Sequence, residues 1–194
     1  MLKDIWTRDF SLCFAAQAAM AFVFCLLIPT LPIYLSDLGA KEVEIGLLVG
    51  VASVSSLVAR PWVGRILLRV PEKRFMMMGA IIYALSSFLY LFVKPFFPLF
   101  VVRTFHGIGI AFFSTALITL VARISPENQR GRSLSIFYLA FSIPFALAPS
   151  AAILILDLSS FQALFLICTS ISLCGVVVLL RLRTGAWSKA ESSG

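Results

Sequence analysis

The amino-acid sequence predicts an all-α membrane protein with six transmembrane helices. Hydrophobic residues make up 60% of the chain and charged residues only 13%, whereas a soluble domain is nearer half apolar and about a quarter charged. The apolar residues form six long runs, and the basic residues gather in every second segment between those runs. With this distribution, the net charge of +7 indicates membrane topology and lipid contact rather than nucleic-acid binding.

Each apolar run is long enough to form a spanning helix, which needs about 20 apolar residues. The expected helices are residues 10–34, 44–66, 75–92, 96–121, 133–156 and 161–180. Helices are expected because unpaired backbone groups cannot face lipid. We expect residues 1–194 to form one six-helix bundle, with an uncleaved first helix and with residues 183–194 as a cytoplasmic tail.

The distribution of Lys and Arg predicts the orientation in the membrane. The chain start, the second and fourth connections and the tail hold thirteen basic residues, whereas the other connections hold only Lys41 and Lys94. The remaining basic residue, Arg103, lies inside an apolar run. Because basic residues favour the cytoplasmic side, both termini are expected to be cytoplasmic, in a protein that crosses the cell (inner) membrane six times.

The first helix carries one amide among apolar side chains. Gln17 shares a helix face with Met20, Ala21 and Phe24. A polar group among methionine and aromatic side chains suits an amphiphilic organic substrate, so Gln17 and Phe24 are candidate pathway residues. An ordinary hydrogen bond between helices is the alternative role of Gln17.

The second helix and its following connection hold a cluster of basic residues. This segment runs from Arg60 to Arg74. We interpret all of its basic side chains as belonging to a loop or a helix end. In helix two, Gly46 and Gly50 have the small-x-x-x-small spacing that allows close helix packing, although glycine is common in membrane helices in any case.

The fourth expected helix contains a charged residue inside its apolar run. Arg103 lies where hydrocarbon is expected, at a cost of several kcal/mol. At 1.5 Å per residue, Arg103 lies roughly 10 Å below the outer helix end and His106 about 15 Å, near the midplane. Arg103, His106 and Ser114 share one face, so we expect them to line a substrate or proton pathway.

Two alternatives remain open for these residues. Arg103 could snorkel to the outer interface, because its side chain is long. His106, the single histidine of the chain, could instead be a packing residue that bonds to a neighbouring carbonyl.

The fifth helix contains Pro144 and Pro149. Each proline removes a backbone hydrogen bond, so we expect this helix to be kinked.

Four cysteines occur in the apolar runs, without a Cys-x-x-Cys spacing and without a neighbouring histidine. They are Cys13, Cys25, Cys168 and Cys174. A metal or redox site is one interpretation, but this setting favours four small hydrophobic side chains. We therefore expect no metal and no cofactor.

Four segments, in this order, resemble the amino-terminal half of a major facilitator superfamily (MFS) transporter. Residues 29–39 resemble the first outer loop of that family, and residues 60–74 resemble its basic loop between helices two and three. The motif Arg103-Thr-Phe-His-Gly107-Ile-Gly109 resembles that of helix four, and residues 125–132 resemble the connection into helix five.

The resemblance implies roles for particular residues of the basic loop. The residues that match a gating loop are Gly64, Arg65, Arg69, Lys73 and Arg74. The family usually has an aspartate and a second glycine where this chain has Leu68 and Pro71. The latch to which that aspartate contributes is therefore in question, and topology alone is the other explanation of the basic residues.

The resemblance also implies a function. The expected fold is one half of the MFS fold, a 3+3 inverted repeat, and the expected function is secondary transport of small organic solutes rather than enzyme catalysis. The drug or metabolite efflux branch is the nearest, which implies a proton-coupled antiporter that pairs with a second six-helix half, as a homodimer or as a separate chain. A non-transporting remnant or membrane scaffold is the alternative function. An intramembrane enzyme is disfavoured, because the sequence has no Asp dyad and no His-rich metal motif.

No acidic residue lies deep in an expected span. Carriers driven by protons often use a buried Asp or Glu. A proton site in this chain would therefore be His106, whose side chain titrates near neutral pH when unperturbed, or it would lie in a partner half.

Overall fold

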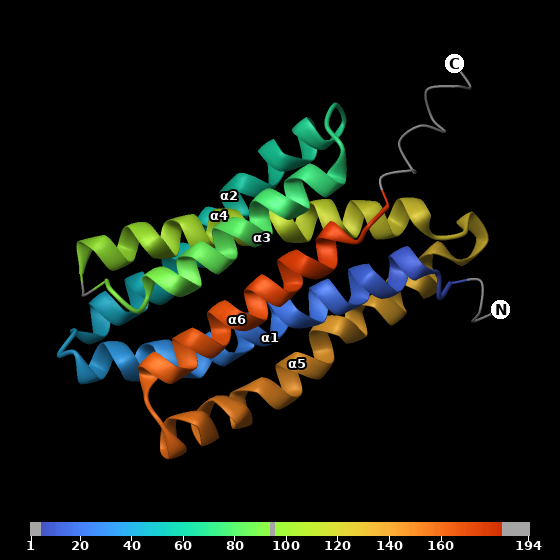
Figure 1. Cartoon of the computed structure of the whole chain (residues 1–194). Coiled ribbons are helices and arrows are strands. Elements are labelled where there is room, and N and C mark those ends of the chain that lie inside the picture. The colour runs from blue at the N-terminus through green and yellow to red at the C-terminus, as the bar shows by residue number, and fades with distance from the viewer. Residues whose placement is uncertain (1–4, 94–95, 184–194) are drawn as a thin grey trace.

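The computed structural model describes residues 5–93 and 96–183, which form six long helices in one elongated bundle (Figure 1). Their bounds are α1 Arg8–Asp37, α2 Glu42–Leu67, α3 Glu72–Leu89, α4 Phe97–Ile124, α5 Arg130–Leu158 and α6 Phe161–Leu180, with a short 3₁₀ helix, η1, at Glu127–Gln129. Lys3, Lys94, Lys189 and the tail beyond residue 183 lie outside the described residues.

The helix ends follow from local side-chain chemistry. The Thr7 hydroxyl accepts a hydrogen bond from the Phe10 amide at the start of α1, and the Ser160 hydroxyl accepts one from the Ala163 amide at the start of α6. These side chains satisfy amides that have no partner within the helix. The turn after α1 passes through Gly39, whose φ of 79° favours glycine because that residue lacks a Cβ.

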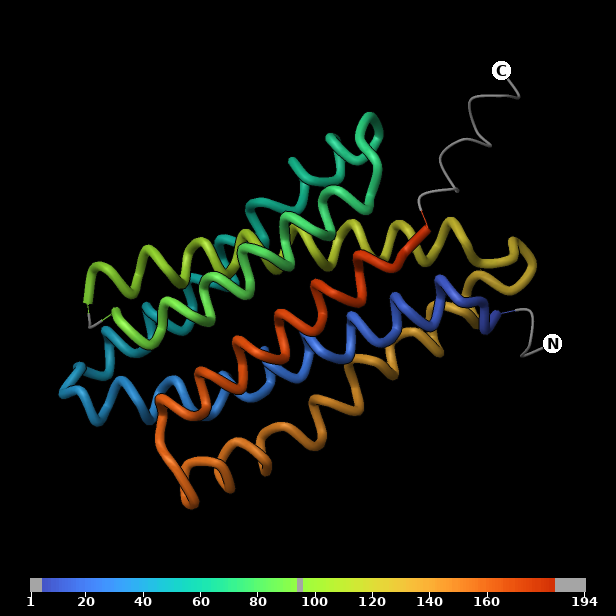
Figure 2. Tube along the Cα trace, in the orientation of Figure 1, coloured from blue at the N-terminus to red at the C-terminus, as the bar shows by residue number. Residues whose placement is uncertain are grey.

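The helices pack in two groups. In the first group α4 packs against α2 and α3, and in the second α1 packs against α5 and α6. Contact between α3 and α6 joins the two groups, as Figure 2 shows along the middle of the bundle. The buried core therefore lies along α1, α3 and α4, whereas α2 and α5 leave many large apolar side chains exposed.

The start of α1 and the end of α6 lie at the same end of the bundle (Figure 1). Nη2 of Arg8 donates a hydrogen bond to the Arg181 carbonyl at 3.5 Å. The turn between α2 and α3 and the segment between α4 and α5 lie at this end too. Apart from Lys41 at the start of α2, the described basic residues at the helix ends therefore gather at one end of the bundle, which we call the basic end.

Five helices of the described chain are long and apolar enough to cross a membrane: α1, α2, α4, α5 with its η1 extension, and α6. The chain is accordingly a multi-pass membrane protein. The helix that does not meet this criterion is α3, because its first turn is the charged sequence Glu72-Lys73-Arg74. Only the part of α3 that follows Arg74 is apolar, so the number of spans is five by this measure, against the six that the sequence predicts.

Helix α1 extends past its predicted end, whereas α2 ends within one residue of its own predicted end. Helix α1 continues through Pro29 and Pro32 to Asp37, so most of the segment that resembles an outer loop is helical. Helix α2 continues through Pro61 to Leu67, so Arg60 lies within a helix and not in a loop. Our assignment of every basic residue except Arg103 to a loop or a helix end is therefore wrong for Arg60.

Helix α5 is continuous through Pro144 and Pro149, and its trace bends along its length (Figure 2). Pro144 is buried against the bundle. The bend fits two missing hydrogen bonds in one helix.

The closest helix contacts are made by glycines of α3 and α4. A Cβ built on Gly107 would overlap Ser55 and the Ala52 carbonyl of α2, and a Cβ on Gly79 of α3 would lie 2.8 Å from the Gly109 carbonyl. In contrast, a Cβ on Gly46 or Gly50 would meet no atom within 4 Å. The small-x-x-x-small spacing of α2 therefore does not mark a close approach between the described helices, whereas the helix-four glycines do.

Candidate functional site

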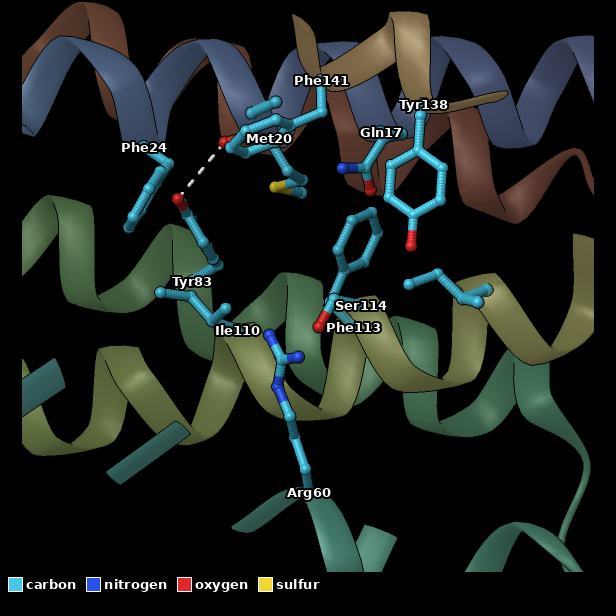
Figure 3. A pocket seen from close by; sticks show the side chains of 12 residues that line it. Gln17, Met20, Phe24, Arg60, Tyr83, Ile110, Phe113, Ser114, Tyr138 and Phe141 are labelled. Atoms are coloured by element: carbon cyan, nitrogen blue, oxygen red, sulfur yellow. Dashed lines mark hydrogen bonds between the residues drawn. The ribbon is translucent and has the colours of Figure 1, made fainter. Parts of the chain in front are cut away.

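A cavity of about 310 Å³ opens between α1, α2, α4 and α5 (Figure 3). It is lined by Gln17, Met20, Ala21, Phe24, Arg60, Tyr83, Ile110, Phe113, Ser114, Ile118, Tyr138 and Phe141. Ligand pockets for small molecules have about this size and the same mixture of aromatic walls and few polar groups.

Three residues predicted for the pathway line this cavity: Gln17, Phe24 and Ser114. Phe24 of α1 lies beside Phe141 of α5, with ring centroids 6.5 Å apart. The Ser114 hydroxyl oxygen is buried and has no hydrogen-bond partner within the described chain. These residues therefore form one apolar wall with two polar groups, the amide of Gln17 and the hydroxyl of Ser114.

Tyr83 closes the cavity from the α3 side. Its hydroxyl donates a hydrogen bond to the Met20 carbonyl of α1 at 3.2 Å, which Figure 3 shows as a dashed line. Sequence reasoning did not select Tyr83, because its helix face carries no polar pattern that separates it from an ordinary core position.

Arg103 does not line the cavity. Its side chain is 7% exposed and reaches α2, where Nε donates to the Leu48 carbonyl at 2.9 Å and Nη2 donates to the Val49 carbonyl at 3.0 Å. The guanidinium is thus held by the backbone of a neighbouring helix. The structure shows neither of the two expected arrangements, exposure to a pathway or snorkelling to the helix end.

His106 is fully buried beside Arg103 and lies outside the cavity lining as well. Its Nδ1 lies 2.7 Å from the Tyr90 hydroxyl, and Nη1 of Arg103 donates to the same hydroxyl at 3.5 Å. The edge of the Tyr83 ring packs against the imidazole, with centroids 4.2 Å apart. His106 is therefore bonded to a tyrosine hydroxyl and not to the carbonyl that the packing alternative proposes.

Because guanidinium can only donate, the Tyr90 hydroxyl accepts from Arg103 and is free to donate its own proton to His106. In that arrangement Nδ1 of His106 is an acceptor, and the ring proton sits on Nε2, an atom without a hydrogen-bond partner within the described chain. The polar face of α4 is thus divided into two parts. Arg103 and His106 form a buried cluster with Tyr90, and Ser114 faces the cavity.

Arg60 is the charged residue of the cavity lining, and the sequence did not indicate it as a site residue. Its side chain extends from α2 towards the cavity, near Ile110 and Ser114 of α4 (Figure 3). The sequence does carry a signal for this position. Residues on both sides of Arg60 continue the apolar pattern of helix two to residue 67, so a basic residue there is part of a helix face.

The expected gating residues lie at the basic end of the bundle. Gly64 and Arg65 are exposed in the last turns of α2, and Arg69 and Arg74 are exposed on either side of the following turn. Nζ of Lys73 donates to the carbonyls of Leu180 and Leu182 at the end of α6. These residues therefore lie in and around the turn between α2 and α3, outside the cavity lining.

An acidic side chain also lies at this end. Glu72 is 5% exposed and forms an ion pair with Arg123 of α4 at 2.8 Å. This pair ties the start of α3 to the end of α4, within the six-helix bundle. Glu72 follows Leu68 by four residues, and Leu68 occupies the position at which the resembled family has its aspartate.

The four cysteines are free thiols, three of them buried and Cys174 exposed. Within residues 5–93 and 96–183, no group of three or more His, Cys, Asp and Glu side chains could hold a metal ion.

The bundle defines a multi-pass membrane protein with a largely apolar cavity between its helices. The sequence profile described as Major Facilitator Superfamily matches residues 13–194, and the chain therefore belongs to the Major Facilitator Superfamily, a family of transporters rather than enzymes. The resemblance recognised in the sequence is thereby confirmed.

Similar proteins agree with this assignment. An uncharacterized MFS-type transporter of Methanocaldococcus jannaschii is 28% identical over 150 residues, which cover 77% of this chain and 39% of the relative. The quinolone resistance protein NorA of Staphylococcus aureus is 28% identical over 124 residues, which cover 64% of this chain and 32% of the relative. The matched segments thus span about a third to two fifths of the length of these relatives.

Solved structures show the same fold. A POT family transporter crystallised in complex with 5-aminolevulinic acid superposes with a TM-score of 0.82 at 19% identity, over 92% of this chain and 39% of that chain. The human organic anion transporter MFSD10 (TETRAN) superposes with a TM-score of 0.75 at 16% identity, over 91% of this chain and 47% of that chain. In both cases this chain matches less than half of the compared transporter.

Proposed function

We propose that this chain is the amino-terminal six-helix half of a secondary transporter that exports small drug-like or metabolite-like compounds in exchange for protons. The observation that carries the proposal is the cavity between α1, α2, α4 and α5, whose wall combines aromatic side chains with Gln17 and Ser114. Such a wall accepts an amphiphilic organic compound. The NorA relative, which is named for quinolone resistance, favours export of drug-like compounds.

The helix packing supports a repeated design with six spans. If α1, α2 and α3 are exchanged with α4, α5 and α6, the contacts of α1 with α5 and α6 become the contacts of α4 with α2 and α3. The contact between α3 and α6 is kept under this exchange. This symmetry fits a 3+3 inverted repeat, in which α3 is the equivalent of α6 and crosses the membrane with its charged first turn at the interface.

A second six-helix half completes the carrier in this proposal, as another copy of this chain or as a separate chain. The relatives are about three times as long as the matched segment. Exposed apolar side chains on α2 and α5, such as Leu57, Trp62 and Phe145, offer a surface for that half or for lipid. Alternating access needs movement between two such bundles, so a single copy is not expected to transport.

Proton coupling needs a titratable group within the membrane. Within the described bundle the proposed proton site is His106, because imidazole is the side chain whose unperturbed titration lies near neutral pH. It is enclosed by Tyr83 and Tyr90, so proton access to it needs a second conformation. The other proposed location is an acidic residue of the second half.

Orientation follows the positive-inside rule in this proposal. Most basic residues lie in the helix ends and connections at the end of the bundle where α1 begins and α6 ends (Figure 1), which places both termini in the cytoplasm. A reporter enzyme that works only in the cytoplasm, fused after Gly194, should be active. Activity of a periplasmic reporter at the same position would reverse the orientation.

Cysteine labelling tests whether the cavity is a water-filled substrate site. In a Cys174→Ser background, Ser114→Cys should react with a membrane-impermeant maleimide in opened vesicles, because Ser114 faces the cavity. Leu85→Cys on α3, which is 55% exposed and faces away from the cavity, should not react. A quinolone at saturating concentration should protect position 114.

Reconstitution tests the need for a second half. Vesicles that contain on average less than one copy of the chain should show no quinolone transport, whereas vesicles with the chain and a second six-helix half should transport. Transport by single copies would contradict the requirement for a second half. An unreactive Ser114→Cys would contradict the cavity as the substrate site and leave the scaffold alternative.

A further inference from the structure

Arg60 is a charged residue inside a membrane helix that sequence analysis and family membership leave without a role. It lies seven residues before the end of α2, or about 10 Å from that end at 1.5 Å per residue. A charge at such depth is costly unless it faces a partner or a polar cavity. Arg60 is one of the residues that line the cavity, and its side chain extends towards α4 (Figure 3).

The described chain offers no anion to Arg60. Among residues 5–93 and 96–183, no ion pair to Arg60 is found. The acidic residues of the described chain are Asp9, Asp37, Glu42, Glu44, Glu72, Glu127 and Asp157. All of them lie in η1 or in the first or last turn of a helix, and none lines the cavity. Arg60 is therefore the only formal charge in the cavity lining, which makes the cavity electropositive.

Neutral polar groups accompany this charge. Gln17 of α1, Ser114 of α4 and Tyr138 of α5 all line the same cavity. The Ser114 hydroxyl is buried without a partner in the described chain, and a hydroxyl can donate a hydrogen bond to an anion. The tyrosine hydroxyl and the glutamine amide are further donors that can reach into the cavity, as Figure 3 shows for their side chains.

The rest of the lining is apolar. Met20, Phe24, Phe113 and Phe141 supply thioether and aromatic surface, which suits a flat hydrophobic body. A cavity of about 310 Å³ holds one small organic molecule. A planar guanidinium binds the two oxygens of a carboxylate or a related oxyanion through a pair of parallel hydrogen bonds.

We propose that Arg60 is the anion-binding residue of the cavity and that the substrates are monoanionic organic acids with an aromatic or aliphatic body. The proposal rests on the proposed transport function and names the class of substrate. In the bound state the acid group lies against Arg60 and Ser114, and the apolar body lies against the aromatic side chains of α1 and α5.

Three probes that share one ring system test the charge preference: 1-naphthoate, 1-naphthamide and 1-naphthylmethylamine, which are anionic, neutral and cationic. Binding to the full chain in lipid nanodiscs is measured with radiolabelled probes by scintillation proximity, without any transport step. The parent chain should bind naphthoate about tenfold or more tightly than naphthamide, the change expected for a hydrogen-bonded charge. Naphthylmethylamine should bind more weakly than naphthamide.

Substitutions then assign the preference to Arg60. Arg60→Gln should weaken naphthoate binding by about tenfold or more and leave naphthamide binding within about twofold. Arg60→Lys keeps the charge without the planar fork, so its naphthoate affinity should lie between those of the parent chain and Arg60→Gln. The matched control is Arg132→Gln, which removes an exposed arginine of α5 outside the cavity and should leave the binding of all three probes unchanged.

Several outcomes overturn the inference. They are equal binding of naphthoate and naphthamide to the parent chain, undetectable naphthoate binding, and an unchanged naphthoate affinity in a folded Arg60→Gln. Folding of each variant is checked by circular dichroism and by elution as a single species. Because binding is measured without transport, these outcomes reject the anion site and leave the transporter proposal to its own tests. An unreactive Ser114→Cys rejects the cavity itself.

Discussion

The side chain of Arg103 in α4 binds the backbone of α2 at Leu48, with 2.9 Å between Nε and the carbonyl oxygen. A second bond joins Nη2 to the Val49 carbonyl at 3.0 Å. Carbonyls in a helix interior already accept one hydrogen bond from within the helix, and each has a second lone pair. Arg103 uses these second lone pairs, so it connects two helices without breaking either.

We predict that Arg103→Ala destabilises the bundle. It removes two charged hydrogen bonds between α4 and α2, and hydrogen bonds to charged groups contribute about 1.5–3 kcal/mol each. The carbonyls keep their bonds within α2, so no buried acceptor is left empty and the loss should lie at the lower end of this range. Thermal unfolding in detergent, followed by circular dichroism, measures the change in Tm.

The control for this substitution is Arg132→Ala, at an exposed position in the first turn of α5. Its Tm should match that of the parent, because exposed charges contribute little. Arg103→Lys should be intermediate, since its ammonium lacks the planar fork that fits two adjacent carbonyls. If Arg103→Ala unfolds at the temperature of the Arg132→Ala control, the contacts to α2 contribute no stability.

A second prediction concerns Tyr90, whose hydroxyl lies between Arg103 and His106. Tyr90→Phe removes the hydroxyl and keeps the ring, which packs against Phe165 with centroids 5.5 Å apart. Loss of the shared hydrogen bond should lower the free energy of unfolding by about 1–3 kcal/mol, because Nδ1 of His106 is left buried without a partner.

A double-mutant cycle tests whether these groups act together. With Tyr90→Phe and His106→Ala as the single variants, the coupling energy should be about 0.5–3 kcal/mol. The control pair is Tyr90→Phe with Ser135→Ala, because Ser135 is exposed and bonds only to its own helix at the Gly131 carbonyl. Additive effects of Tyr90→Phe and His106→Ala would mean that the 2.7 Å contact carries no energy.

Most of the fold was predictable from the sequence because membrane helices follow from the length of apolar runs. The predicted span 161–180 coincides with α6, whereas α1 continues three residues past the predicted end. Pro29 and Pro32 each leave a carbonyl without its helical partner, but they do not stop the helix. An apolar run predicts a helix but not how deep each end of that helix lies in the membrane. Helix α3 shows this difference, because its first turn is charged.

The candidate site was predictable only in part. Gln17, Phe24 and Ser114 line the cavity because helical spacing defines a face, and α1 and α4 both face the cavity. Arg60 lines the cavity that was expected for Arg103, and Arg103 is buried against α2, because the neighbour of each residue depends on how α2 crosses α4. Sequence spacing defines which residues share a face but not which helix covers that face.

The third prediction tests the close contact between α4 and α2. Gly107→Ala places a methyl group where Ser55 and the Ala52 carbonyl lie, so the helices must move apart. Overpacking of this kind costs about 1–3 kcal/mol. Gly50→Ala is the matched control in a neighbouring membrane helix, because its methyl group meets no atom within 4 Å.

The changes in Tm caused by Gly107→Ala and Gly50→Ala should differ in sign as well as in size. Alanine has the higher helix propensity by about 1 kcal/mol, so Gly50→Ala should leave Tm unchanged or raise it, while Gly107→Ala should lower it. Equal Tm values for the two variants would show that α2 does not approach α4 at Gly107.

The last prediction concerns the ion pair between Glu72 and Arg123, which joins α3 to α4 at 2.8 Å. The carboxylate is nearly buried, with 6% of its side chain exposed, whereas the Arg123 side chain is 34% exposed. Glu72→Gln should destabilise the bundle by about 1–3 kcal/mol, because the loss lies between that of an exposed pair and that of a fully buried one. Arg123→Gln should have a similar effect, since it leaves a buried carboxylate without its partner.

The exchange variant, Glu72→Arg with Arg123→Glu, should recover part of the stability lost in Glu72→Arg alone. The recovery should shrink little between low and high salt, because a buried pair is weakly screened. Glu127→Gln is the control, at an exposed position in η1, and should leave Tm unchanged at either salt concentration. Additive Tm losses in the exchange variant would mean that the two charges stabilise the helix ends separately and that α3 and α4 are held together by their apolar contacts alone.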